Sequence, residues 1–115
     1  MLDKNARQWQ SLDMLPVMID NVQQAIHASK NAQERLKYHQ PDLMPNDLWS
    51  DQQCLVDHEI QIEQLLLIRQ QVEFWRKNHY LTPVQKIEIL HLENTIAECE
   101  NLSQQVVFML HDRLK

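Results

Sequence analysis

The residues in this chain best suited to catalysis or metal binding are carboxylates, histidines and cysteines in its second half. Glu88 and His91 form a Glu-x-x-His motif, which supplies ligands in carboxylate-bridged di-iron bundles. Such a site needs a second copy of the motif and two further glutamates, and the sequence has no second copy. Glu59, Glu63 and Glu73 could be imagined as partners. We interpret the single short match as part of a solvated helix face.

Cys54 and His58 are four residues apart, so they would share one face of a helix. A zinc site needs further ligands, and none of the six histidines has the His-x-x-x-His spacing of a zinc-binding helix. No nucleophile stands beside a supporting base. The sequence therefore predicts no metal site, no cofactor and no enzymatic activity. Cys54 and Cys99 are too few for a disulfide scaffold, and buried reduced thiols would favour a cytoplasmic protein.

Glycine is absent from all 115 residues, whereas average usage would give about eight. Glycine supplies the positive-φ conformations that tight hairpins need. Its absence excludes glycine-rich phosphate loops and makes a β-rich fold with many turns a poor candidate. The length fits one domain over residues 1–115.

Prolines and capping residues mark the ends of the predicted helices. Pro41 and Pro45 interrupt one helix, and Asn46 or Ser50 would cap the next, with Ser50 and Gln53 as a capping box. Thr82 would cap the last helix, followed by proline and by glutamine at the third position. The predicted elements are a short turn over 3–10 and long helices over about 13–39, 46–78 and 82–113.

Apolar spacing within these ranges predicts an all-α fold. The second predicted helix is apolar on two sides, which indicates packing between neighbours or a binding surface. The last helix carries a coiled-coil-like seam with alternating spacings of three and four: Ile89, Leu92, Ile96, Cys99, Ser103, Val106 and Leu110. Because the connections are short, neighbouring helices should be antiparallel. We therefore expect an antiparallel up-down-up bundle of three long helices.

Charge is unevenly placed in this arrangement. The net charge is −5, so the composition is not that of a polybasic nucleic-acid binder. The up-down-up order nevertheless gathers cations at one pole: Lys4, Arg7, Arg76, Lys77 and Lys86. No apolar run approaches the length of a membrane span, and the first residues lack the apolar core of a signal peptide.

Two stretches resemble a known family. Leu55-Val-Asp-His58 is followed by Ile62-Glu-Gln-Leu-Leu66, and later comes Leu92-Glu-Asn-Thr-Ile-Ala-Glu-Cys99. Over about residues 50–110 this pattern is similar to the C-terminal domain of the PriC family of bacterial primosomal replication-restart proteins. The resemblance implies a non-enzymatic protein that binds single-stranded-DNA-binding protein and helps reload the replicative helicase. Residues 46–115 carry six Lys or Arg against eleven Asp or Glu, which argues against direct nucleic-acid binding.

The resemblance also implies a partner segment, the acidic C-terminal tail of single-stranded-DNA-binding protein, which ends in an apolar residue. Such a tail requires an apolar pocket rimmed by arginines. On the second helix the candidates are Arg69 and Arg76, with Phe74 and Trp75 beside them. The alternative is that the aromatic residues belong to the core and its rim, and that the arginines complement the helix dipole.

Two other classes of function fit the same composition. The stretch from Ile62 to Arg69 resembles a segment of FliT-type flagellar chaperones, which suggests a secretion or flagellar export chaperone. Alternatively, the last helix could pair through its seam with a second copy, as a self-associating structural protein. Trp9, Trp49 and Trp75 would then be natural interface anchors.

Overall fold

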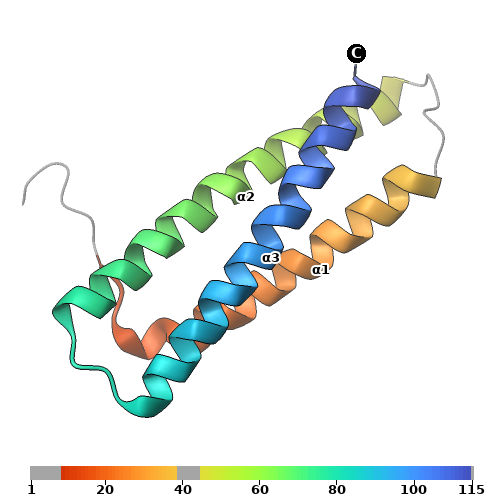
Figure 1. Cartoon of the computed structure of the whole chain (residues 1–115). Coiled ribbons are helices and arrows are strands. Elements are labelled where there is room, and N and C mark those ends of the chain that lie inside the picture. Colours follow the sequence, from red (N-terminus) through yellow and green to blue (C-terminus); the bar gives the residue numbers. More distant parts are fainter. Residues whose placement is uncertain (1–8, 39–44, 115) are drawn as a thin grey trace, which may run out of the picture.

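The computed structural model describes residues 9–38 and 45–114, and within these ranges it is helical and contains no strand. A short 3-10 turn leads into three long helices (Figure 1): η1 (Leu12–Met14), α1 (Leu15–Tyr38), α2 (Pro45–Asn78) and α3 (Pro83–Arg113). The prediction of an all-α fold with three long helices is confirmed. Residues 3–8 of the predicted N-terminal turn lie outside the described residues, and Trp9 and Gln10 belong to no helix.

α3 begins at the predicted capping box. The Thr82 hydroxyl accepts a hydrogen bond from the Gln85 backbone N–H at 3.1 Å, and the Gln85 side-chain oxygen accepts one from the Thr82 N–H at 3.0 Å. Pro83 occupies the first turn, where a missing N–H costs nothing. These bonds satisfy two backbone donors that a helix start otherwise leaves unpaired.

The predicted range of α2, about 46–78, agrees with the observed helix, but its predicted cap was wrong. α2 begins at Pro45, so Asn46 and Ser50 lie inside the helix and neither is its cap. Gln53 donates its side-chain amide to the Asp57 carboxylate, one turn further along, at 3.0 Å. A proline is tolerated in the first turn of a helix, which lets α2 start earlier than the capping pattern suggested.

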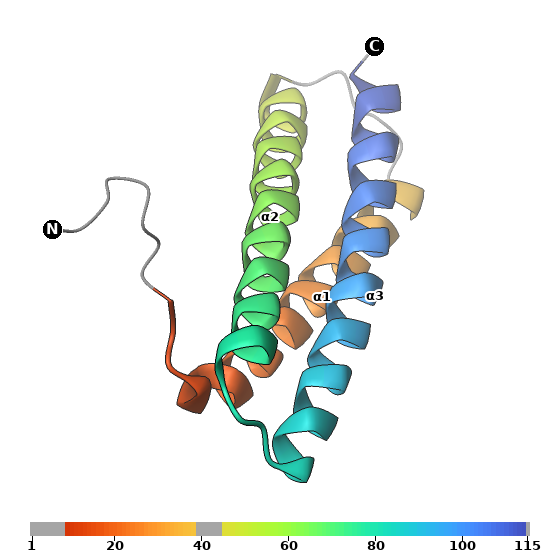
Figure 2. The ribbon, with the colours of Figure 1, turned by 60° about the vertical axis from the view of Figure 1, so that its left-hand side comes forward.

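α3 is the central helix of the bundle. It packs along both α1 and α2, whereas α1 and α2 touch each other at few points. The chain ascends α1, descends α2 and ascends α3, so helices adjacent in sequence are antiparallel (Figure 1). In Figure 2, α2 and α3 run side by side while α1 crosses behind them at an angle. One long side of α2 is therefore covered by α3, and much of its remaining surface faces outward.

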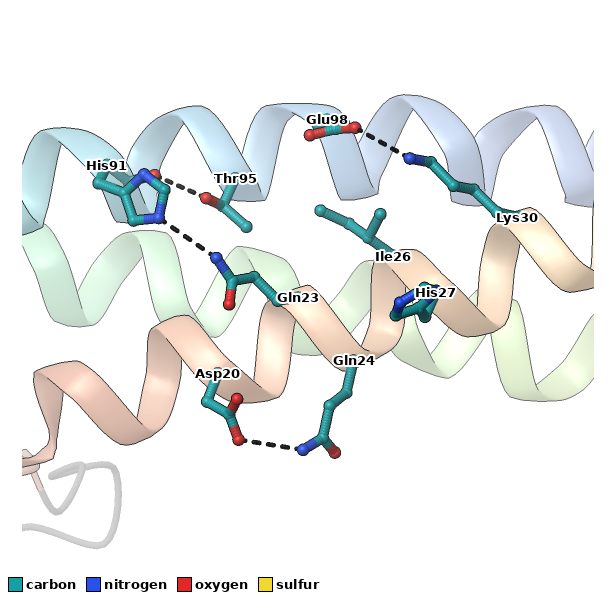
Figure 3. Close-up of a pocket in the computed structure, with 9 residues that line it drawn as sticks. All are labelled: Asp20, Gln23, Gln24, Ile26, His27, Lys30, His91, Thr95 and Glu98. Atoms are coloured by element: carbon teal, nitrogen blue, oxygen red, sulfur yellow. Dashed lines mark hydrogen bonds and ion pairs between the residues drawn. The ribbon is translucent and has the colours of Figure 1, made fainter.

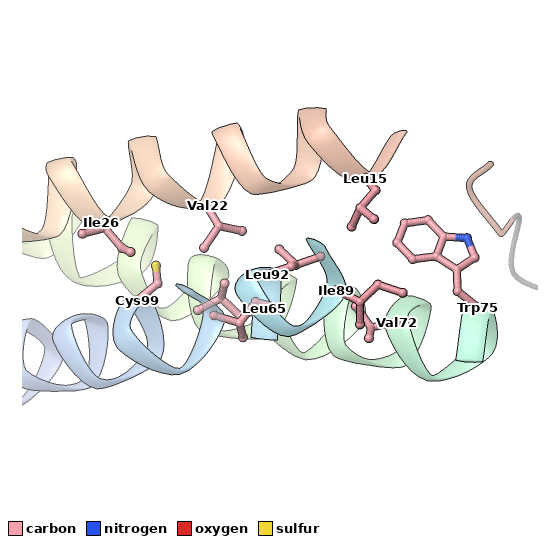
Figure 4. Close-up of a cluster of buried hydrophobic side chains, with 10 residues drawn as sticks. Leu15, Val22, Ile26, Leu65, Val72, Trp75, Ile89, Leu92 and Cys99 are labelled. Carbon is pink, nitrogen blue, oxygen red and sulfur yellow. The ribbon is translucent and has the colours of Figure 1, made fainter. Parts of the chain in front are cut away.

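The main core lies where the three helices converge near the α2–α3 turn (Figure 4). Its buried residues come from all three helices: Leu15, Val22, Ile26, Leu65, Val72, Trp75, Ile89, Leu92, Ile96 and Cys99. A smaller cluster follows toward the end of α3, made by Ala32, Leu36, Val106 and Leu110. Full burial of each large aliphatic side chain contributes roughly 1.5–3 kcal/mol.

The α3 seam is buried within this core. All seven of its residues, from Ile89 to Leu110, are at most 1% exposed. Pairing of two copies through this seam would require α1 or α2 to leave α3 first. The seam therefore holds the bundle together and offers no surface for self-association.

A buried polar layer separates the two apolar clusters. The Gln61 side-chain amide donates to the hydroxyls of Ser29 at 3.1 Å and of Ser103 at 2.5 Å. The two hydroxyls lie 3.4 Å apart, and both serines are fully buried. Because buried polar groups need partners, this layer favours one register of α1, α2 and α3 over shifted alternatives.

Candidate functional site

The two arginines predicted to bind a partner both face α3. Arg69 Nη2 lies 3.0 Å from Glu100 Oε2. Arg76 forms a two-pronged pair with Glu93, through Nη1 to Oε2 at 3.0 Å and a second contact from Nη2 to Oε1. These pairs join α2 to α3 along one edge. Since the side chains are about half exposed, each pair contributes little to stability, typically about 0.2–1 kcal/mol.

Trp75 is a core residue and lines no surface. Its side chain is fully buried, and its indole N–H donates to the Gln10 carbonyl at 2.9 Å. The Gln10 N–H in turn donates to the Gln71 side-chain oxygen at 2.6 Å. Trp75 therefore attaches the segment before η1 to α2, which corresponds to the structural alternative for this residue.

Phe74 lies on the outward side of α2, beneath Trp9. The two rings stack with centroids 4.3 Å apart and planes inclined by 7°. His79 meets the Phe74 ring edge-on at 5.8 Å. The structure therefore does not bring Arg69, Phe74, Trp75 and Arg76 together, because they point from α2 in three different directions.

One of the four predicted residues does line a pocket. At the α2–α3 turn a cavity of about 470 Å³ is formed by Arg76, Leu81, Lys86, Ile89 and Leu90. Ile89 belongs to the core, whereas Leu90 is 57% exposed. We call this cavity the turn pocket. It has an apolar floor and a cationic rim, the two properties expected for recognition of an acidic tail with an apolar end.

Of the two cations on the rim of the turn pocket, Lys86 is the one more available to bind an anion. Among the described residues, none forms an ion pair with its ammonium group, whereas Arg76 is already paired with Glu93. The sequence placed Arg76 and Lys86 at the same pole, but it carried no signal for Leu81 and Leu90 as pocket residues. Their role follows from the turn geometry, which folds the start of α3 against the end of α2.

A second cavity, of about 450 Å³, lies between α1 and α3 (Figure 3). Its walls are polar, and their groups bond to one another: Gln23 to His91 at 3.3 Å, Gln24 to Asp20 at 3.0 Å, and Lys30 to Glu98 at 3.8 Å. This groove brings His91 and Glu98 of α3 near His27 of α1. Lys30 offsets Glu98, whereas the Asp20 carboxylate bonds to the neutral Gln24 amide, so with neutral histidines the groove carries a slight net negative charge.

At the far end of the bundle, charged groups join all three helices. Asp51 of α2 is 4% exposed and contacts Arg113 of α3 at 2.9 Å and Arg35 of α1 at 3.6 Å. A buried carboxylate requires such partners because desolvation of an unpaired charge is costly. This cluster closes the end of the bundle where α1 leads toward α2.

Cys54 and His58 lie next to this charged cluster. His58 Nδ1 is 2.9 Å from the Cys54 carbonyl oxygen and 3.5 Å from Cys54 Sγ. Because a carbonyl can only accept, Nδ1 carries the proton. The hydrogen bond from His58 lowers the pKa of the Cys54 thiol; burial opposes this, and the charges of His58 and Arg35 reinforce it. The hydrogen bond with the Cys54 thiol raises the pKa of His58, against burial, and the backbone bond to Cys54 adds to the rise.

The motif residues considered for metal binding do not form a ligand set. No group of three or more histidine, cysteine, aspartate or glutamate side chains suited to a metal occurs in residues 9–38 and 45–114. Glu88 is half-buried, and Nε2 of His91, the other motif residue, accepts a hydrogen bond from the Gln23 side-chain amide in the α1–α3 groove. The solvated-face interpretation fits His91, which is exposed.

None of the protein-family models, curated proteins or solved structures compared with the chain matches it. The resemblance to the PriC family therefore stays a prediction that rests on the residues quoted for it. Among the described helices, none combines the length and the apolar character needed to cross a membrane.

Proposed function

We propose that this chain is a non-enzymatic adaptor that binds an acidic peptide tail in the turn pocket. The observation that carries the proposal is the combination of an apolar floor with the Lys86 ammonium on its rim. Its volume, about 470 Å³, falls within the usual range for ligand pockets, roughly 300–1,000 Å³. The apolar side chain of the tail's last residue would contact Leu81 and Leu90. The C-terminal carboxylate of the same residue would bind the Lys86 ammonium group.

Arg76 supports the same interaction without leaving Glu93. A guanidinium has five N–H donors, and the Glu93 pair uses Nη1 and Nη2 through one side of the group. The remaining donors are free to bind a second carboxylate. Glu93 lowers the net positive charge at this edge, so Lys86 makes the larger electrostatic contribution.

The partner class follows from the earlier resemblance. In the PriC family the acidic segment is the C-terminal tail of single-stranded-DNA-binding protein, and we propose the same partner here. A role in reloading the replicative helicase during replication restart is the corresponding cellular function. It rests on the resemblance, whereas acidic-tail binding also rests on the turn pocket.

Fluorescence anisotropy with a labelled acidic peptide that ends in a free apolar residue tests this proposal. We expect micromolar-range binding that weakens as salt rises, because screening reduces exposed charge interactions. Lys86→Glu and Leu90→Ser should each weaken binding at least tenfold. Lys77→Glu is the matched control, since it makes the same charge change at the same end of the bundle, in the last turn of α2, but lies outside the pocket.

Three outcomes would contradict acidic-tail binding. These are no binding at low salt, equal losses from Lys77→Glu and Lys86→Glu, and undiminished binding of a peptide whose terminal residue is replaced by serine. Full-length single-stranded-DNA-binding protein should bind, and its tail-deleted form should not. Co-purification with one secreted or flagellar protein instead would favour the export-chaperone alternative.

A further inference from the structure

The outward side of α2 carries an apolar stripe that the bundle does not cover. Val56, Ile60 and Leu67 are 48%, 47% and 49% exposed. Their spacings of four and seven residues place them on one side of the helix. Leu65 and Val72, which face the core, are each only 2% exposed. We call Val56, Ile60 and Leu67 the α2 outer stripe.

Neighbouring elements leave this stripe accessible. α3 covers the opposite side of α2, and α1 contacts α2 at few points. Phe74, seven residues beyond Leu67, continues the same line but is already covered by Trp9. The stripe is therefore exposed from Val56 to Leu67, and the Trp9–Phe74 stack covers the next position along the same line.

The surface around the stripe is acidic. Residues 50–68 contain no lysine or arginine. Asp57 and Glu59 are exposed on opposite flanks of the stripe, and the exposed Glu63, seven residues after Val56, lies in its line between Ile60 and Leu67. The fourth acid in this stretch, Asp51, is buried and paired. Glu59 lies 3.8 Å from Nε2 of His111, and this histidine offsets the Glu59 charge only when it is protonated. No described residue forms an ion pair with Asp57 or Glu63.

We propose that the α2 outer stripe is a docking surface for a basic amphipathic helix of a partner protein. The apolar residues of such a helix would pack on Val56, Ile60 and Leu67. Lysine or arginine side chains at its flanks would approach Glu59 on one side and Asp57 on the other, and a cation near its centre would approach Glu63. Helix-in-groove recognition uses apolar anchors at such helical spacings.

Charge selects this occupant over a second copy of the chain. Two copies joined through the stripe would bring Asp57, Glu59 and Glu63 against their own counterparts. Like charges placed opposite each other oppose association and reject the wrong partner. A basic helix reverses the sign of this interaction and steers association through complementary potential.

This surface is separate from the turn pocket. The stripe lies on the first two-thirds of α2, whereas the pocket begins at Arg76, at the end of the same helix. The two surfaces have opposite charge, so they select opposite partners, an acidic tail and a basic helix. The docking surface goes beyond the proposed function, because it would let one chain hold two different proteins.

The probe for this proposal is a synthetic lysine–leucine peptide with leucines at helical spacing on one face. A second peptide of identical composition but scrambled order cannot form that face, and a glutamate–leucine peptide reverses the charge. Fluorescence anisotropy should show binding of the first peptide at least tenfold tighter than either control. Backbone amide shifts in NMR spectra should concentrate in residues 56–67.

Two variants separate the apolar and the electrostatic contributions. Ile60→Ser with Leu67→Ser should weaken binding at least tenfold at all salt concentrations. Glu59→Gln with Glu63→Gln should weaken it at low salt and have a smaller effect at high salt. The matched control is Ile87→Ser with Phe108→Ser, which removes two apolar side chains from α3, 68% and 76% exposed, and leaves the turn pocket intact. All variants change exposed residues, and circular dichroism would verify their folding.

Equal binding of the ordered and scrambled peptides would overturn the proposal, because it would show charge attraction without a docking surface. An equal loss from the α3 control, or amide shifts centred outside α2, would also overturn it. A concentration-dependent dimer in sedimentation that Ile60→Ser with Leu67→Ser abolishes would assign the stripe to a second copy. Failure of acidic-tail binding in the turn pocket would leave these results unchanged.

Discussion

The indole N–H of Trp75 donates to the backbone carbonyl of Gln10, 2.9 Å away, across 65 residues of sequence. This bond satisfies the only polar group of a fully buried side chain. It also fixes the segment before η1 against α2, where Trp9 stacks on Phe74. A residue that the sequence suggested as a binding anchor is therefore a junction between the N-terminal segment and the core.

Replacing Trp75 tests this structural role. Trp75→Ala should destabilise the protein by about 3–5 kcal/mol, as truncation of a buried aromatic residue usually does. Trp75→Phe keeps most of the apolar volume but leaves the Gln10 carbonyl without its donor, so we expect a smaller loss. Urea unfolding followed by circular dichroism measures both values. A loss below about 1 kcal/mol for Trp75→Ala would contradict the core assignment, because surface substitutions fall in that range.

The polar layer can be tested by combining substitutions at its three residues. Gln61→Leu removes the amide donor from the buried Ser29 and Ser103 hydroxyls, which keep each other and, for Ser103, the weakly bonding Cys99 thiol. The loss should cost roughly 1–3 kcal/mol. Adding Ser29→Ala and Ser103→Ala removes those hydroxyls and should recover part of the loss. Chemical unfolding of the single and combined variants measures this coupling. Strictly additive losses would show that Gln61 does not bond to the serines.

Asp51 should be the most sensitive charged position in the described part of the chain. Asp51→Ala leaves Arg113 and Arg35 facing each other without the carboxylate that joins them. Removing one partner from a buried ion pair typically costs about 3–5 kcal/mol. The exposed pair of Arg69 and Glu100 is the comparison, and Arg69→Ala should cost under about 1 kcal/mol. Thermal unfolding would distinguish the two, and equal losses would contradict the assignment.

The two cysteines should react at very different rates. Thiolate is the nucleophilic form, and the His58 hydrogen bond lowers the pKa of Cys54. Alkylation of Cys54 by iodoacetamide should therefore persist as pH falls below the usual thiol pKa, and decline only through the lowered pKa. Burial raises the pKa of Cys99, and its side chain is fully buried, so Cys99 should stay unmodified until the protein unfolds.

His58→Ala provides the control for this pH dependence. Without the imidazole, the alkylation profile of Cys54 should move to higher pH, toward that of an ordinary thiol. Mass spectrometry of peptides after timed alkylation gives the rate for each cysteine. An unchanged profile would show that His58 does not stabilise the thiolate.

The same two shifts have opposite consequences for stability. A lowered thiol pKa adds stability that is present above the unfolded pKa of Cys54 and is lost as pH falls through the folded pKa. A raised imidazole pKa adds stability that is present below the unfolded pKa of His58 and is lost as pH rises through the folded pKa. Urea unfolding of Cys54→Ala and His58→Ala, measured from below the unfolded pKa of His58 to above the unfolded pKa of Cys54, would separate the two contributions.

Several features of this protein were determined by local sequence. The capping box at Thr82 and the apolar spacing along α3 each depend on residues a few positions apart, and the absence of glycine holds over the whole sequence. Such patterns predict helices because the α-helix repeats every 3.6 residues and needs specific groups at its ends. The capping residue of α2 was misjudged for the same reason, since a proline, an asparagine and a serine can all stand near the beginning of a helix.

The side of each helix that meets a neighbour was decided by the tertiary structure. Phe74 and Trp75 are adjacent in sequence, yet one lies outward beneath Trp9 and the other is fully buried. The sequence showed that α2 is apolar on two sides, but only the packing against α3 distinguishes its buried line from the α2 outer stripe. Leu81 and Leu90 join Arg76 and Lys86 in one pocket for the same reason, because the packing at the α2–α3 turn brings these side chains together. Burial depends on which surfaces pack, and that is a property of the whole chain rather than of any local pattern.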